Sequence, residues 1–150
     1  MSYYIMYGLL YFLKKNRFFL LVLFTGLRYE VGGDFQWYYN LALKIDMWQY
    51  ERIELINKMF YTIIWELNLP AQSIIVIYGF LTMYFIQKGF NYKRLKNNRN
   101  VYLTLFCFPM FLFYFFYFIR QGLAVAIVFY SYKYVKEKKF VKFIFWIITA

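Results

Sequence analysis

The sequence predicts an all-α membrane protein: a polytopic helical bundle of about five to six spans, the first and last incomplete, with one outward amphipathic helix. Three observations predict this class. Of the 150 residues, 63% are hydrophobic and 28% are aromatic, well above the usual globular composition. Several apolar runs approach the ~20 residues that a helix needs to cross a hydrocarbon core of ~30 Å. Short basic clusters separate these runs, as in the cytoplasmic loops of membrane proteins.

The net charge of +11 follows this topology and does not indicate nucleic-acid binding. Nucleic-acid binders gather Lys and Arg on one face of a folded surface. Here thirteen of the 18 Lys and Arg lie in three short clusters between apolar runs, at residues 14–17, 88–99 and 133–142. Six of the seven acidic residues lie in the intervening segments. We therefore assign the clusters to the cytoplasm, and residues 28–70 and Arg120 to the outside.

The first two apolar segments are short. Residues 3–13 enter the cytoplasm and residues 18–27 return outward. At a rise of 1.5 Å per residue, each segment covers only about half of a bilayer. Either the first helix has lost its beginning or the two segments form a short hairpin, and we favour the lost beginning.

A polar corner follows, with the sequence GLRYEVGGDFQWYYN at residues 26–40. Glycine tolerates positive φ, so Gly32 and Gly33 predict a sharp turn. Asp34 stands where the N-cap of a helix beginning FQWYYN would be. The alternative for Asp34 is a catalytic carboxylate.

Residues 53–68 follow the 3.6-residue period of an amphipathic helix. Such a helix would lie along the outer membrane interface or pack over the bundle. Pro70 ends it. The apolar stripe consists of Ile53, Ile56, Phe60, Ile63, Ile64 and Leu67. The residues largely off this stripe are Glu54, Asn57, Lys58, Tyr61 and Glu66.

The remaining spans alternate in direction. Residues 71–86 run inward, 101–119 outward, and 121–135 inward again. The segment at residues 121–135 begins with small residues, which favour close helix packing. Residues 140–150 begin one further outward span. We find no internal repeat and no soluble domain, so residues 1–150 form a single integral-membrane region.

The residue types present exclude several kinds of site. The one cysteine, Cys107, provides no disulfide framework. There is no histidine, so His-based zinc sites and Ser-His or Cys-His nucleophile pairs are excluded for this chain. We expect no metal site and no cofactor.

Two arginines stand at the predicted outer boundary. Arg120 lies at the bend between two spans, and Arg28 lies at the same level after a different span. An arginine side chain can bind phosphate through two parallel hydrogen bonds, so two arginines that converge here would suit a pyrophosphate. Interfacial snorkelling is the alternative for Arg120, and a salt bridge to Glu30 or Asp34 is the alternative for Arg28.

The aromatic residues of the corner leave two interpretations. Trp37, Tyr38 and Tyr39 would fit an interfacial aromatic belt. They would equally fit a surface that stacks on sugar rings, and the sequence does not separate the two.

Two stretches resemble a known family. RYEVGGDFQWYYN resembles the outward-loop signature of the EpsG and Wzy-like polysaccharide polymerases, and FIRQGLAVAIVFYSY resembles their second signature. The resemblance covers roughly residues 18–150. Gly33 stands where the family often has Thr. Family members are typically much longer and usually carry a further outward loop with a His, so we interpret the chain as the N-terminal portion of a longer polymerase.

The resemblance implies a polymerase in the bacterial cytoplasmic (inner) membrane, multi-pass, with its functional face outward. It would extend an extracellular or surface glycan from polyprenyl-pyrophosphate-linked repeat units. The implied catalytic residue is Asp34, and the implied substrate-binding residues are Arg28, Tyr29, Tyr38, Tyr39, Arg120 and Gln121. The implied partners are the lipid-linked oligosaccharide, the lipid bilayer and other glycan-assembly membrane proteins.

Three points stay open at the level of sequence. The chain could be a non-catalytic membrane partner in a glycan-assembly system. It could also be a flippase-like fragment that binds lipid pyrophosphate without chemistry. The third open point is whether these 150 residues catalyse the reaction alone, because part of the family pattern is missing.

Overall fold

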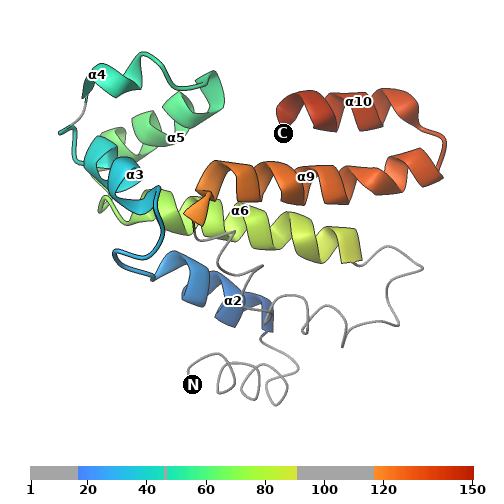
Figure 1. Cartoon of the computed structure of the whole chain (residues 1–150), viewed down its shortest axis with the longest axis horizontal. Helices are drawn as coiled ribbons and strands as arrows, with labels where there is room; N and C mark the ends of the chain where they lie inside the picture. The colour runs from blue at the N-terminus through green and yellow to red at the C-terminus, as the bar shows by residue number, and fades with distance from the viewer. Residues whose placement is uncertain (1–16, 46, 91–116) are drawn as a thin grey trace.

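The computed structural model describes residues 17–45, 47–90 and 117–150, and every regular element in these ranges is a helix (Figure 1). The all-α prediction is therefore confirmed for the described part of the chain. Residues 3–13 and most of 101–119, with Cys107 and Pro109, lie outside it. The helices are α2 (Arg17–Gly26), α3 (Phe35–Ala42), α4 (Met47–Tyr50), α5 (Leu55–Glu66), α6 (Ser73–Phe90), α9 (Ile119–Lys136) and α10 (Phe140–Thr149).

Helix α6 is the centre of the arrangement. It packs against α2 on one side and α9 on the other, and α10 folds back along α9 (Figure 1). Helices α3 to α5 cover the end of α6 at which that helix begins. The α6 side chains Ile74, Ile75 and Tyr78 are almost fully buried there. This end of the bundle joins α3, α5 and α6 in one apolar core.

Two glycines allow α2 and α6 to approach closely. A Cβ atom on Gly79 would lie 2.8 Å from the Thr25 hydroxyl oxygen and 3.4 Å from the Gly26 backbone nitrogen. A Cβ atom on Gly26 would lie 3.1 Å from the Cα of Val76. The close contact therefore depends on the missing side chains, as at other small-residue helix interfaces in membranes.

We expect Gly79→Leu to separate α2 from α6 and destabilise the protein by about 1–3 kcal/mol, the range for overpacking a tight interface. Thermal unfolding in detergent micelles measures the change. Phe80→Leu is the matched control, because Phe80 is the next residue and is 44% exposed. Equal stability of the two variants would show that the glycine contact is unimportant.

Among the described helices, α6 is the one that is long and apolar enough to cross a membrane. Helix α9 has the same length of 18 residues but carries Arg120, Lys133 and Lys136. Helix α10 is apolar and has 10 residues. The described structure thus shows one clear candidate span, and the predicted total of five to six is not established by it.

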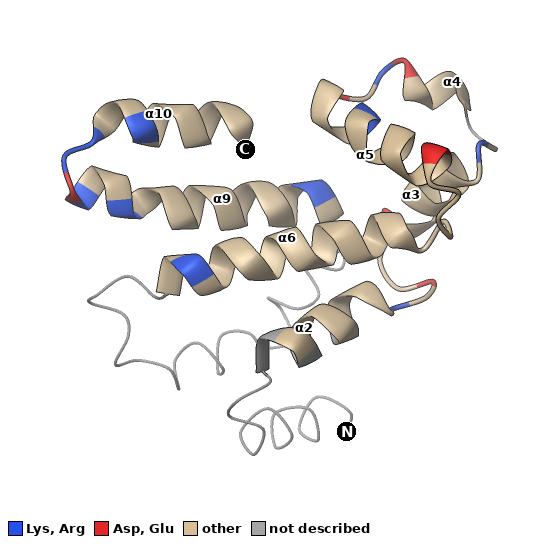
Figure 2. Ribbon diagram, turned by 180° about the vertical axis from the view of Figure 1, so that it is seen from behind, with Lys and Arg blue, Asp and Glu red and all other residues tan. Residues whose placement is uncertain are grey.

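Basic side chains gather where α6 and α9 end, whereas the region of α3 to α5 carries charges of both signs (Figure 2). Lys88 lies in the last turn of α6, and Lys133 and Lys136 lie in the last turn of α9. Glu54 is the N-cap of α5, and it pairs with Arg120 in the first turn of α9. This distribution has the pattern that the positive-inside rule describes.

The predicted amphipathic helix is present as α5, but only half of the predicted apolar stripe packs inward: Ile53 and Ile64 are buried, and Phe60 packs against the core. Its buried residues are Asn57, Tyr61 and Ile64. Of the stripe, Ile56, Ile63 and Leu67 are 47%, 43% and 65% exposed. Two residues predicted to lie off the stripe are buried instead. Asn57 forms hydrogen bonds with Glu54 and Tyr78, and the Tyr61 ring packs against the Trp65 ring. The apolar residues left outside would suit contact with lipid.

Candidate functional site

The polar corner is a tight turn between α2 and α3. Gly32 has a φ of 105°, which confirms the predicted use of glycine for positive φ. Asp34 occupies the N-cap position of α3, but its side chain makes no capping hydrogen bond, so this part of the prediction is wrong. The Phe35 amide, at the first position of α3, donates to the Gly32 carbonyl over 3.2 Å, so the turn itself satisfies this one amide of the helix start.

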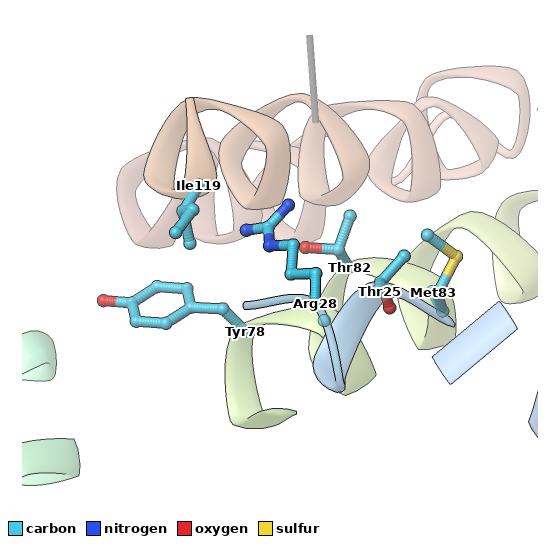
Figure 3. A pocket seen from close by; sticks show the side chains of 7 residues that line it. Thr25, Arg28, Tyr78, Thr82, Met83 and Ile119 are labelled. Atoms are coloured by element: carbon cyan, nitrogen blue, oxygen red, sulfur yellow. The ribbon is translucent and has the colours of Figure 1, made fainter. Parts of the chain in front are cut away.

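Arg28 points from this corner into the interior (Figure 3). It lines a cavity of about 10 Å³ with Thr25, Tyr78, Gly79, Thr82, Met83 and Ile119. Burial lowers the pKa of Arg28 from its ordinary 12.5 to about 10, and the nearby Asp34 carboxylate partly opposes this. The guanidinium is still protonated at neutral pH. The cavity has room for about one water molecule and is too small for a pyrophosphate.

Gln72 fixes the backbone that carries Arg28. Its side-chain amide nitrogen donates to the carbonyl oxygen of Gly26 over 2.8 Å and to that of Arg28 over 2.7 Å. These carbonyls belong to the end of α2, where helical partners are missing. The two bonds therefore connect the end of α2 to the start of α6.

We expect Gln72→Glu to lower the free energy of unfolding by about 1–3 kcal/mol, because a carboxylate cannot donate to the two carbonyls and they lose their partner. Gln87→Glu, near the far end of α6, is the control for the added charge. Chemical unfolding of both variants in detergent measures the difference. No difference between them would show that the connection to Gln72 contributes little.

Arg120 begins a chain of polar contacts that crosses three helices. Its Nη1 atom donates to both carboxylate oxygens of Glu54 over 2.8 Å, and its guanidinium carbon lies 5.7 Å from the centre of the Trp37 ring. The Asn57 side-chain nitrogen donates to Glu54 Oε2 over 2.6 Å, and the Tyr78 hydroxyl donates to Asn57 Oδ1. The hydrogen bond from its own backbone lowers the pKa of Glu54, and the bond from Arg120 lowers it further, so the carboxylate is ionised at neutral pH.

This polar chain faces a cavity of about 420 Å³ formed by α5, α6, α9 and α10. The polar residues on its wall are Glu54, Asn57, Tyr78, Arg120, Gln121 and Thr149. The apolar residues include Ile56, Leu123, Ile127 and Ile148. The volume lies within the roughly 300–1,000 Å³ range of small-molecule sites. Of the two cavities described, this is the one that can hold a ligand.

Comparison with known protein families identifies the chain. The EpsG family model matches residues 11–150, which is nearly the whole sequence. The chain belongs to the EpsG family. The suspected relationship is thereby confirmed, and it associates this EpsG-family chain with exopolysaccharide biosynthesis. Family membership and the apolar helix α6 together indicate a membrane protein. No curated protein and no solved structure gave a significant match.

The two arginines of the EpsG-family chain lie at the same end of the bundle but line different cavities. Arg28 lines the small cavity and Arg120 the large one. Tyr78 belongs to the wall of both, and Ile119, the neighbour of Arg120, closes the small cavity. The two arginines therefore share Tyr78 as a common wall residue, but they do not line one cavity.

The other residues predicted to bind substrate are divided between surface and core. Gln121 lines the large cavity beside Arg120. Tyr29 is 60% exposed, and its ring contacts those of Phe35 and Tyr39 at 5.6 and 6.0 Å. Tyr38 is 1% exposed and packs against Tyr78, with a ring separation of 5.3 Å. Of these tyrosines, Tyr38 is therefore not available for surface stacking in this conformation.

Sequence reasoning missed the partners of the arginines. Glu54, Asn57 and Tyr78 complete the polar wall, and Gln72 holds the Arg28 backbone. One signal was available for Asn57, because a polar side chain within a helix of a membrane protein often lies in a functional interior. Glu54 and Tyr78 gave no such signal, since a surface Glu and an interfacial Tyr are ordinary.

Proposed function

We propose that this chain takes part in polysaccharide polymerisation at the outer face of the bacterial cytoplasmic membrane. The reaction moves a growing glycan from one polyprenyl-pyrophosphate carrier to the sugar end of another lipid-linked repeat unit. The observation that carries the proposal is Arg120 on the wall of a 420 Å³ cavity, beside a carboxylate and an amide. The small cavity, which Arg28 lines, has no room for such a ligand.

Arg120 is suited to hold the pyrophosphate. Only its Nη1 is engaged with Glu54, and a guanidinium has five N–H donors. The two partners are 45% and 64% exposed at their side chains, so their ion pair is worth about 0–1 kcal/mol and a phosphate can compete with it. Charge-assisted bonds from Arg120 would then stabilise the negative charge of the departing carrier.

Arg28 has a supporting electrostatic role in this proposal. It places a positive charge in the small cavity, whose wall shares Tyr78 with the large cavity. Asp34 favours the protonated form of Arg28, so we assign Asp34 to maintaining that charge and keep acceptor deprotonation as its alternative role. Burial of the Arg28 guanidinium reduces the screening of its charge by water, so the charge acts more strongly over a given distance than a fully solvated one would.

The proposed orientation places α3 to α5 outside and the basic ends of α6 and α9 in the cytoplasm. Helices α2, α6, α9 and α10 belong to the spans of a multi-pass bundle. The exposed apolar residues of α10, which include Val141, Ile144 and Ile148, would contact lipid or other glycan-assembly membrane proteins. The polyprenyl tail of the substrate would lie along this same apolar surface.

Cysteine labelling tests the orientation. In a Cys107→Ser background, we expect Glu30→Cys and Gln121→Cys to react with a membrane-impermeant maleimide added to intact cells. Lys138→Cys should react only after the membrane is permeabilised, because it lies in the basic turn between α9 and α10. Labelling of positions 30 and 121 from opposite sides of the membrane would remove the shared outer site and the proposal with it.

A chain-length assay tests the reaction. Deleting the gene should leave single repeat units in place of long glycans, and restoring it should recover the ladder on a gel. A flippase would instead change how much lipid-linked repeat unit crosses the bilayer, with chain length unaltered. A normal ladder in the deletion strain would contradict polymerisation by this protein.

A further inference from the structure

We propose that the cavity between α5, α9 and α10 binds a neutral, hydroxyl-rich sugar ring, and that Glu54, Asn57 and Tyr78 form its hydrogen-bonding edge. The inference rests on the proposed function for the source of this sugar, which would be the acceptor end of a lipid-linked repeat unit. Glu54, Asn57 and Tyr78 would thus bind the acceptor sugar, a part of the substrate that the proposed function does not assign to the arginines.

The polar edge is pre-organised by its own contacts. Glu54 is held between Arg120 and Asn57, with both hydrogen bonds under 3 Å. Asn57 is held in turn by the Tyr78 hydroxyl. All four residues line the same cavity, although they come from α9, from α6 and from α5 with its N-cap. A ligand therefore meets donors and acceptors whose positions are already set, which lowers the entropic cost of binding.

The part of the wall that α9 and α10 form beyond Arg120 has a different character. Leu123, Ala124 and Ile127 from α9 and Ile148 from α10 present an apolar surface to the cavity. A pyranose ring has hydroxyl groups around its edge and C–H groups on its faces. A cavity with one polar edge and one apolar wall matches both parts of such a ring, in the manner of small-molecule sites with few, well-placed polar groups.

Charge distinguishes a sugar from a phosphate as the occupant. Phosphate oxygens accept hydrogen bonds, and a carboxylate such as Glu54 also only accepts, so a phosphate fits the Arg120 donors that Glu54 does not use better than it fits the Glu54 edge. A sugar hydroxyl donates and accepts, and can bind Glu54 through its hydrogen and Asn57 or Arg120 through its oxygen. Arg120 therefore marks the boundary, with the sugar on its Glu54 side and the pyrophosphate beyond it.

Saturation-transfer NMR tests this assignment with the full chain in lipid nanodiscs of phosphatidylethanolamine and phosphatidylglycerol. The probes are the methyl β-glycosides of glucose, galactose and N-acetylglucosamine. We expect at least one glycoside to bind the unaltered chain. Glu54→Gln should weaken that binding about tenfold, because a charged acceptor is lost. Ala124→Phe should abolish it by filling the cavity, and this variant leaves the polar edge unchanged.

Glu66→Gln is the matched control, since Glu66 is exposed at the far end of α5 and does not line the cavity. It should bind the glycoside as the unaltered chain does. Three results overturn the proposal: no binding of any of the three glycosides, binding that survives Ala124→Phe, or an unchanged affinity in Glu54→Gln. Loss of binding in Glu66→Gln would also overturn it, because the effect would then not be specific to the cavity.

Inorganic pyrophosphate separates this inference from the proposed function. Its binding should depend on Arg120 and should persist or strengthen in Glu54→Gln, which removes a competing negative charge. If pyrophosphate binds and no glycoside does, the sugar site is wrong and the polymerase proposal stands. If glycosides bind and Arg120→Lys leaves pyrophosphate binding unchanged, the sugar site stands and the role of Arg120 in the proposed function fails.

Discussion

Arg120→Lys should reduce the glycan from a long ladder to single repeat units. Lysine keeps the positive charge, but it loses the planar fork that binds phosphate through two hydrogen bonds. It also loses the present geometry, in which one guanidinium nitrogen reaches both Glu54 oxygens and the cation lies over Trp37. Charge-assisted hydrogen bonds are each worth about 1.5–3 kcal/mol, so we expect elongation to slow at least about tenfold.

The measurement is the chain-length distribution of glycan from cells that express each variant at equal level. Arg52→Lys is the matched control, because Arg52 also lies in the outward segment and over a tryptophan, 5.4 Å from the ring centre of Trp48. Arg52 lines neither of the two cavities. If Arg120→Lys and Arg52→Lys both give the full ladder, Arg120 does not bind the pyrophosphate.

Arg28→Met should stop elongation while the protein becomes more stable. Burial lowers the pKa of Arg28 to about 10, so the folded state holds this proton less tightly than the unfolded state does. The charged form therefore destabilises the fold at every pH below about 10, and this loss disappears only as the pH rises through the unfolded value. Methionine has a similar length without the charge, and we expect a gain of about 1–3 kcal/mol at neutral pH.

This prediction is tested by two measurements on the same variant. Thermal unfolding in detergent measures stability, and the glycan ladder measures function. Arg28→Lys is the companion variant, which retains a charge and should keep partial elongation. A less stable Arg28→Met protein that still makes long glycans would show that Arg28 has a structural role only.

Much of the fold could be predicted because it depends on local pattern. The predicted segments at residues 18–27, 71–86, 121–135 and 140–150 correspond to α2, α6, α9 and α10 within a few residues. Apolar length and basic flanks define such helices without reference to the rest of the chain. The glycine turn at Gly32 was likewise a local property of the backbone.

The candidate site could be predicted only in part. Arg28 and Arg120 were expected at one boundary, and both lie at that end of the bundle, but their separation into two cavities was not foreseen. The face of α5 was interpreted by hydrophobicity, which assumes that a buried face is apolar. Asn57 and Tyr61 are buried because partners satisfy or pack against them, and such partners are invisible to a periodicity argument.

The helical class, the order of the helices, the excess of basic residues at one end of the bundle and the family were all predictable from the amino-acid pattern. These properties come from composition and from interactions between residues close in the chain. The packed fold was needed to show that Glu54 binds Arg120, 66 residues away, that Gln72 hydrogen-bonds to the end of α2, and that Tyr78 lines both cavities. These contacts depend on how α5, α6 and α9 pack, and packing depends on the shapes of side chains from distant segments.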